Sequence, residues 1–143
     1  MPNHRNLLTI LLVLVLVIGL RGWMIASDGI PFDSDEAIVD LMARHITQGK
    51  PIPTFFYGQH YMGSLNAIAV AGAFELLGES VEIGRVVHLA IFLLTLLSGY
   101  ALAGAVTGSN RVAMIALLIM AFPSASATLY TAIPLGGWLR GTP

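Results

Sequence analysis

The sequence lacks cysteine altogether and has few charged residues. Only 10% of its 143 residues are Asp, Glu, Lys or Arg, against roughly 25% in a typical soluble domain. Without cysteine, a disulfide framework, thiol chemistry and a cysteine-based metal site are excluded. A net charge of −1 and the absence of any basic run argue against a nucleic-acid partner. Because 56% of the residues are hydrophobic, the composition predicts an integral membrane protein.

Long apolar runs predict about three transmembrane helices, at residues 7–26, 81–106 and 112–133. The first run reaches the roughly 20 residues that a helix needs to cross the hydrocarbon of a bilayer. Arg21 lies near its far end, where a long side chain can extend to the lipid headgroups. Pro123 is expected to kink the third helix. A cleaved signal peptide is the alternative for the first run, but this run is long for one and lacks the small-residue cleavage pattern.

The first loop, residues 27–80, is expected to carry two short helices, at about 34–48 and 64–77. Asp33 followed by Glu36 has the spacing of a capping box at the start of the first of these helices. Apolar residues at helical spacing predict one apolar stripe on it, formed by Ile38, Leu41, Met42 and Ile46. With charges on its other face, this helix is expected to lie on the membrane surface.

The second short helix, 64–77, would be only about 21 Å long, which is less than a bilayer crossing. We expect it to be re-entrant or packed against neighbouring helices, with a tight span as the alternative. The expected fold is therefore an all-α membrane protein with two short interfacial helices in its first external loop. All of it, 1–143, forms one transmembrane module.

The distribution of charge predicts the orientation. Arg5 precedes the first span, Arg111 lies just after the turn between the second and third spans, and the loop between 28 and 82 is acidic on balance. The positive-inside rule then places the amino terminus in the cytoplasm and the first loop outside. The predicted location is the inner or plasma membrane, crossed several times.

Four carboxylates lie within eight positions at the start of the first short helix, those of Asp33, Asp35, Glu36 and Asp40. Helix capping explains one or two of them, because carboxylates are favoured in a first turn. It does not explain four beside a membrane, where unpaired carboxylates are costly to desolvate. Two functions would explain them: a general base for an acceptor nucleophile, or a divalent metal ion held by Asp35 and Glu36.

Other polar residues have two interpretations each. Arg85 is suited to bind a phosphate through its planar guanidinium, or to pair with Glu82 or Glu75. His45 and His60 are potential metal ligands, or ordinary polar residues of a solvated loop.

The order of motifs resembles the amino-terminal part of the membrane glycosyltransferases of the GT-C fold. The motifs are D-E-A at 35–37, G-K-P-I-P at 49–53, F-Y-G-Q-H-Y-M-G-S-L at 56–65 and L-G-E-S at 77–80. The closer match is the family 39-like branch, with its protein O-mannosyltransferases and lipid A aminoarabinose transferases. The F-E-K-P lysine segment of the aminoarabinose enzymes is absent.

The resemblance implies an enzyme that transfers a sugar from a polyprenyl-phosphate donor to an acceptor on the outer face of the membrane. It gives Asp35 the role of general base or metal-associated carboxylate, with Glu36 as its neighbour. It places Gln59, His60 and Tyr61 near the donor and acceptor cavity, and Arg85 near the lipid phosphate.

Such enzymes have many more spans than this sequence, so the resemblance implies an amino-terminal portion that is inactive alone. The implied partners are the sugar-carrying lipid, the bilayer, and the remaining chain or a partner subunit. One alternative is a small non-catalytic membrane subunit or assembly factor. Another is part of a transporter, with Glu82, Arg85 and His88 lining a path.

Overall fold

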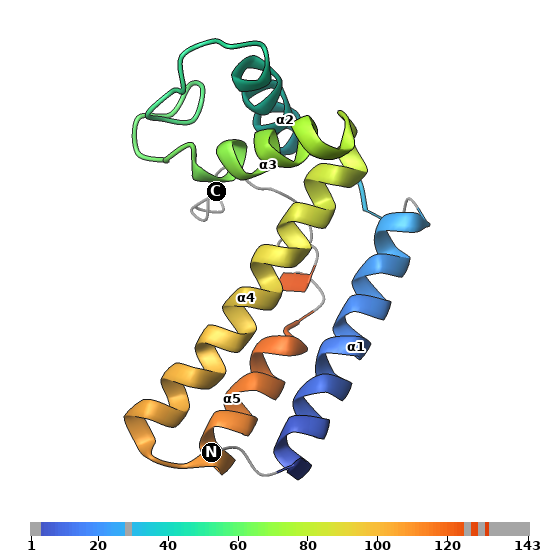
Figure 1. Ribbon diagram of the computed structural model, residues 1–143, viewed down its shortest axis with the longest axis vertical. Coiled ribbons are helices and arrows are strands. Elements are labelled where there is room, and N and C mark those ends of the chain that lie inside the picture. The colour runs from blue at the N-terminus through green and yellow to red at the C-terminus, as the bar shows by residue number, and fades with distance from the viewer. Residues whose placement is uncertain (1–3, 28–29, 125–126, 129–130, 132–143) are drawn as a thin grey trace.

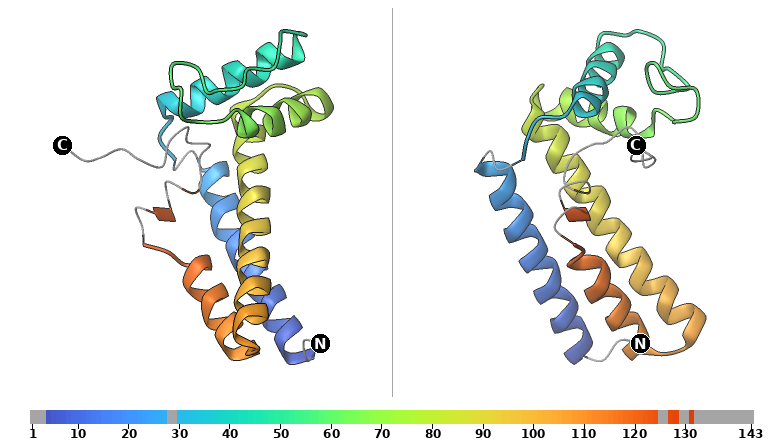
Figure 2. Two further views of the ribbon diagram at one scale, coloured as in Figure 1. Left: turned by 90° about the vertical axis from the view of Figure 1, so that its left-hand side faces the viewer. Right: turned by 180° about the vertical axis from the view of Figure 1, so that it is seen from behind.

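The computed structural model describes residues 4–27, 30–124, 127–128 and 131, and over these residues the chain is all-helical (Figure 1). Its five helices are α1 (His4–Ala26), α2 (Ser34–Thr47), α3 (Leu65–Leu77), α4 (Val81–Thr107) and α5 (Asn110–Ala121). The helices α1, α4 and α5 run alongside one another, and α2 and α3 form a separate layer across one end (Figure 2). The start of α1 and the turn between α4 and α5 lie together at the opposite end.

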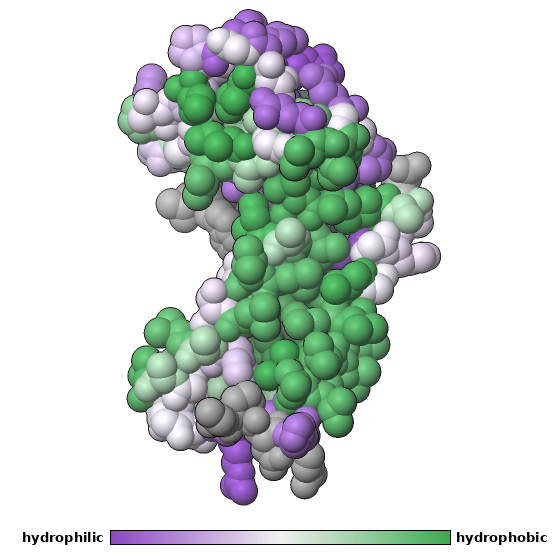
Figure 3. Space-filling model, viewed as in Figure 1, coloured by the Kyte–Doolittle hydropathy of each residue, from purple (hydrophilic) through white to green (hydrophobic). Residues whose placement is uncertain are grey.

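Two helices, α1 and α4, are long and apolar enough to cross a membrane. Their 23 and 27 residues correspond to about 34 and 40 Å of helix. In the most apolar 18-residue stretch of each helix, 6% of the stretch is buried in α4 and 28% in α1. Figure 3 shows the resulting apolar surface, which extends along the helices below the polar layer of α2 and α3. Most apolar side chains of α4 are therefore not buried within the structure, unlike those of a core helix in a soluble protein.

The third predicted span, 112–133, differs from the structure. Helix α5 ends at Ala121, and its 12 residues are about 18 Å long, too short to cross a bilayer. Phe122 leaves the helical conformation, with φ −124° and ψ 66°, because a residue before proline is disfavoured in the α region. Pro123 thus ends the helix, where a kink within a longer helix was expected. Much of 124–133 lies outside the described residues.

The predicted boundaries of the other helices agree with the structure to within a few residues. Asp33 is the N-cap of α2, and its Oδ1 accepts the backbone N–H of Asp35 at 2.9 Å. Ser80 caps α4 by accepting the N–H of Ile83 at 3.3 Å. Gly108 ends α4 in the left-handed conformation, with φ +64°, which glycine adopts without steric cost.

The two larger apolar clusters among the described residues each lie mainly within one layer. The lower cluster joins α1, α4 and α5 through Ile10, Val13, Val17, Leu96, Leu117 and Ala121. The upper cluster joins α2, α3 and the loop between them through Val39, Met42, Ala43, Phe56, Ala67, Val70, Ala71 and Phe74. The buried stripe of α2 is therefore centred on Val39, Met42 and Ala43, and Leu41, a member of the predicted apolar stripe, is 44% exposed.

Helix α3 packs against both α2 and α4. This agrees with the expectation that it packs against neighbouring helices. The layer formed by α2, α3 and the loop between them is called the cap. Within the cap, α3 contacts α2 on one side, through the upper cluster, and the first turns of α4 on the other (Figures 1 and 2).

The loop between α2 and α3 contains a narrow hairpin. Phe55 and Gly63 form an isolated antiparallel bridge, and the N–H of Phe56 donates to the carbonyl of Met62 at 2.9 Å. The Phe56 side chain is buried in the upper cluster and anchors the hairpin to α2 and α3. Gly58, with φ +82°, provides a backbone conformation at the turn that other residues rarely adopt.

Candidate functional site

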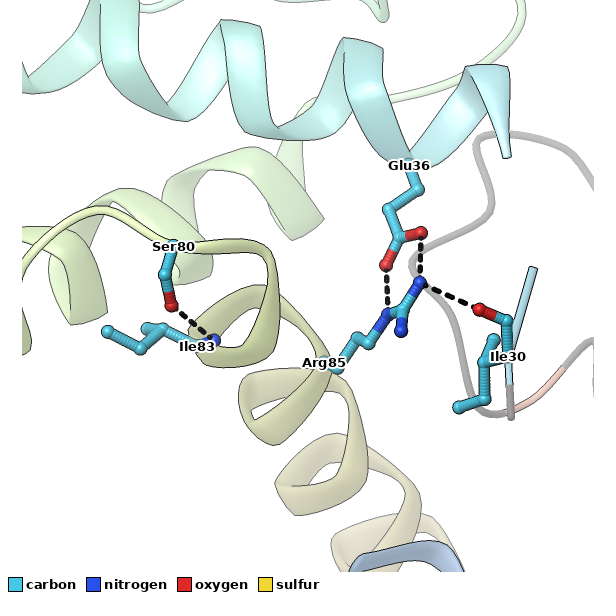
Figure 4. Close-up of polar contacts among 5 residues, drawn as sticks. All are labelled: Ile30, Glu36, Ser80, Ile83 and Arg85. Atoms are coloured by element: carbon cyan, nitrogen blue, oxygen red, sulfur yellow. Dashed lines mark hydrogen bonds and ion pairs between the residues drawn. The ribbon is translucent and has the colours of Figure 1, made fainter. Parts of the chain in front are cut away.

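A buried ion pair joins α2 to α4 at the interface between the two layers. The Arg85 guanidinium donates from Nε to Glu36 Oε1 at 2.7 Å and from Nη2 to Glu36 Oε2 at 2.9 Å (Figure 4). The Glu36 side chain is completely buried, and that of Arg85 is 6% exposed. Nη2 also donates to the carbonyl of Ile30 at 3.3 Å, so the same guanidinium holds the segment that leads into α2.

This pair changes two of the predictions. Glu36 does not complete a capping box, because both of its carboxylate oxygens accept N–H groups from Arg85. Arg85 does pair with a carboxylate, but its partner is Glu36, whereas Glu82 and Glu75 were named from the sequence. The pair therefore positions the first turn of α2 on the amino-terminal end of α4.

Asp35 lies next to Glu36 but differs from it in exposure. Its side chain is partly exposed in the first turn of α2, while its backbone N–H donates to Oδ1 of the N-cap residue Asp33. Among the described residues, no hydrogen bond or ion pair engages the Asp35 carboxylate. Asp35 therefore offers a free acceptor at the edge of the cap.

Asp40 lines a cavity of about 430 Å³ between α2, the end of α3 and the start of α4. Its Oδ1 is buried and accepts no hydrogen bond from any described residue. Burial raises the pKa of the Asp40 carboxyl to about 6, and the charge of Glu36 adds to this rise, against the opposing charges of Arg85 and Arg44. Sequence reasoning counted Asp40 only as one of four acids, since nothing local distinguishes it.

The loop residues predicted to bind substrate lie on the hairpin. His60 and Tyr61 are exposed, Tyr61 by 75%, and Gln59 is partly buried. Gln59 Oε1 is buried and has no hydrogen-bond partner among the described residues. The backbone N–H of Gln59 donates to the carbonyl of Phe56 at 3.1 Å. No hydrogen bond or ion pair in this described region links the three residues to Asp35. Their role in binding substrate stays a prediction.

Among the described residues, the structure does not bring together a set of side chains that could bind a metal ion. The described residues contain no group of three or more His, Asp or Glu side chains that could hold an ion. Glu36 is engaged by Arg85, and His45 Nδ1 lies 2.9 Å from the Tyr57 hydroxyl. A divalent ion at Asp35 and Glu36 stays a prediction.

Arg21 is buried, in contrast to the expected extension toward the headgroups. It is 2% exposed, and its Nη1 and Nη2 donate to the carbonyl and the hydroxyl of Thr131 at 2.7 and 2.6 Å. Its guanidinium carbon lies 3.7 Å from the centre of the Phe92 ring. The charge is thus satisfied inside the protein, as expected for a cation within an apolar helix.

No protein-family model, curated protein or solved structure matches this chain.

Proposed function

We propose that this chain is the amino-terminal module of an integral-membrane glycosyltransferase that uses a polyprenyl-phosphate sugar donor on the extracytoplasmic face. The proposal combines the motif resemblance with the layered arrangement. In this account α1 and α4 cross the membrane, and the layer of α2 and α3 lies at its outer surface. The exposed apolar faces of α1 and α4 support a bilayer as their surroundings.

The observation that carries the proposal is the contrast between the two adjacent acids. Glu36 is fully buried in a bidentate pair with Arg85, whereas Asp35 is partly exposed with no described partner. A buried pair has poor access to substrate but fixes the helix turn that carries its neighbour. Such an arrangement suits Asp35 as the reacting carboxylate and gives Glu36 and Arg85 the role of positioning it.

In the proposed reaction, Asp35 is the general base. Its carboxylate takes the proton from an acceptor hydroxyl while the hydroxyl oxygen attacks the anomeric carbon of the donor sugar. The bond between that carbon and the phosphate oxygen breaks, and the polyprenyl phosphate leaves with the electron pair. The lipid chain of the donor would lie in the bilayer beside α4, close to the cap that carries Asp35.

The proposal is tested in the protein as its native host makes it, with release of polyprenyl phosphate as the readout. Membranes containing wild type, Asp35→Asn or Glu75→Gln are supplied with polyprenyl-phosphate sugars. Glu75 is an exposed acid of α3 and serves as the matched control. We expect Asp35→Asn to lower the rate by about 100-fold or more, the scale of general-base catalysis, and Glu75→Gln to leave it unchanged.

Equal release from Asp35→Asn and wild type would remove Asp35 from the mechanism. If wild type itself released nothing from any donor while a second protein co-purified with it in equal amount, a non-catalytic subunit would replace the transferase proposal.

A further inference from the structure

Asp40 lines a cavity whose lining does not include Asp35, so this cavity is distinct from the proposed reaction site. Its polar lining consists of Asp40, Arg44, Glu79 and Ser80, and its apolar lining includes Phe32, Leu41, Phe74 and Val81. At about 430 Å³ it falls within the roughly 300–1,000 Å³ that small-molecule sites occupy. It lies where the start of α4 and the end of α3 meet the middle of α2.

The charges around the cavity compensate one another except at Asp40. Arg44 Nε donates to Glu79 Oε2 at 2.7 Å across the lining, so these two charges neutralise each other. Arg85, the nearest cation on α4 that acts on Asp40, is engaged by Glu36 in the buried pair. Asp40 is thus the one lining residue, among those described, whose charge has no counter-ion in direct contact.

The Asp40 carboxylate also has unused hydrogen-bonding capacity. Its Oδ1 is buried and accepts nothing from the described residues, and leaving a buried acceptor unpaired destabilises the fold. It packs closely on α4, since a Cβ at Gly84 would lie 2.9 Å from this oxygen. Because Oδ1 lies against Gly84, which does not line the cavity, a cationic ligand would reach the Asp40 carboxylate from its cavity side and supply the counter-charge that the described residues do not.

The apolar lining of the cavity indicates which kind of cation would bind beside Asp40. Phe32 is 60% exposed at the cavity and Phe74 is buried in its wall. Aromatic rings beside a carboxylate favour an organic cation over a hydrated metal ion, because the rings attract an ammonium group and contact its apolar body. We propose that this cavity binds a primary ammonium group carried on an apolar body, with the Asp40 carboxylate as its acceptor.

The test uses phenethylammonium as the probe and the full chain in a non-ionic maltoside detergent at pH 7.5. Binding is followed by isothermal titration and by NMR of the signals from Leu41, Phe74 and Val81. The matched neutral ligand is 2-phenylethanol, which keeps the ring and replaces the ammonium with a hydroxyl. Glu75→Gln is the control variant, because Glu75 is exposed on α3 and does not line the cavity.

We expect saturable binding of phenethylammonium and at least about 10-fold weaker binding of 2-phenylethanol, from the loss of the charge-assisted hydrogen bond. Asp40→Asn should weaken phenethylammonium binding by a similar factor, and Glu75→Gln should not. Equal affinity for amine and alcohol, or an absence of saturable binding, would overturn the proposal. If Asp40→Asn fails to fold, the wild-type NMR spectra still decide: shifts confined to residues outside the cavity would also overturn it.

The ammonium group has two natural sources, a lipid headgroup or a free amine, which a competition experiment distinguishes. Phosphatidylethanolamine is added to the micelles, with its N-acetylated form as the uncharged match. Competition by phosphatidylethanolamine alone would assign the site to a lipid headgroup. Absence of competition, with probe binding intact, would assign it to a free amine. The transferase assay and this binding assay use different variants, so either proposal can fail without the other.

Discussion

Glu36 and Arg85 lie 49 positions apart in the sequence and form a bidentate ion pair with separations of 2.7 and 2.9 Å, buried where the cap meets the long helices. Such a pair contributes little net stability relative to apolar residues of similar volume, since desolvation opposes the attraction. Removing one partner, however, leaves the other charge buried and uncompensated. The pair therefore fixes how α2 sits on α4 more than it adds to the free energy of unfolding.

Removing one partner of this pair is predicted to be far more destabilising than removing both. Arg85→Met should lower the free energy of unfolding by about 3–5 kcal/mol, because Glu36 is then buried alone. The double variant with Glu36→Met and Arg85→Met should recover most of that loss. Unfolding by SDS titration in mixed micelles, followed by circular dichroism, measures each difference.

Arg44→Met is the control for this comparison. Its ion pair with Glu79 is exposed, with 55% and 39% of the side chains accessible, so we expect a cost of about 0–1 kcal/mol. A double variant no more stable than Arg85→Met alone would contradict the account of the buried pair.

Close packing of α2 on α4 predicts a steric effect at Gly84. A Cβ at this position would lie 2.9 Å from Asp40 Oδ1 and 3.8 Å from its Cγ. Gly84→Ala should therefore be less stable than Gly72→Ala by about 1–3 kcal/mol, because the Asp40 carboxyl must shift to make room for the methyl group. Gly72→Ala in α3 is the matched control: nothing lies within 4 Å of its Cβ, and alanine favours the helix by up to about 1 kcal/mol. The same SDS titration applies, and equal stability of both variants would show that the contact does not constrain the helices.

The helices of the cap could be predicted from the sequence because their signals are local. Asp33 begins α2 and Gly78 follows the end of α3, each recognisable from residue type and spacing. The end of α5 was missed because a long apolar run masked the local effect of Pro123 on Phe122. Hydropathy continues past the proline, whereas the backbone conformation does not.

The site was less predictable, because the role of each acid depends on tertiary contacts. Asp35, Glu36 and Asp40 are near neighbours in one helix, yet one is partly exposed, one is paired and one lines a cavity. Helical periodicity predicts the angle of each side chain around α2. It does not predict which residue of another helix each side chain contacts. The sequence offered Glu82 and Glu75 as partners for Arg85, and only the packing of α2 on α4 selects Glu36.

The raised pKa of Asp40 predicts a pH dependence of stability. Burial chiefly raises this pKa to about 6, with the charge of Glu36 next, from an unfolded value of about 3.9. Between these values the folded state binds the proton more tightly than the unfolded state, so the contribution of Asp40 to stability falls as pH rises from about 4 to 6. Asp40→Asn should remove this part of the profile.

Unfolding midpoints of wild type and Asp40→Asn at pH 4.5 and 7.5 measure the effect. The difference between the two proteins should shift in favour of Asp40→Asn at pH 7.5. Glu36, Glu82, Arg44 and Arg85 also act on Asp40, and all four are present in both proteins. A difference that is the same at both pH values would show that Asp40 has no raised pKa.

In the proposed arrangement, α1 and α4 cross a membrane and the layer of α2 and α3 lies on its outer face. Because the sequence has no cysteine, a single introduced thiol reports its own side. His60→Cys places it on the exposed hairpin of the cap, and Asn110→Cys places it at the exposed start of α5, at the opposite end of the molecule (Figure 1). A membrane-impermeant maleimide should label His60→Cys in intact cells, and Asn110→Cys only after permeabilisation. Labelling of both variants in intact cells, or of Asn110→Cys alone, would contradict this arrangement.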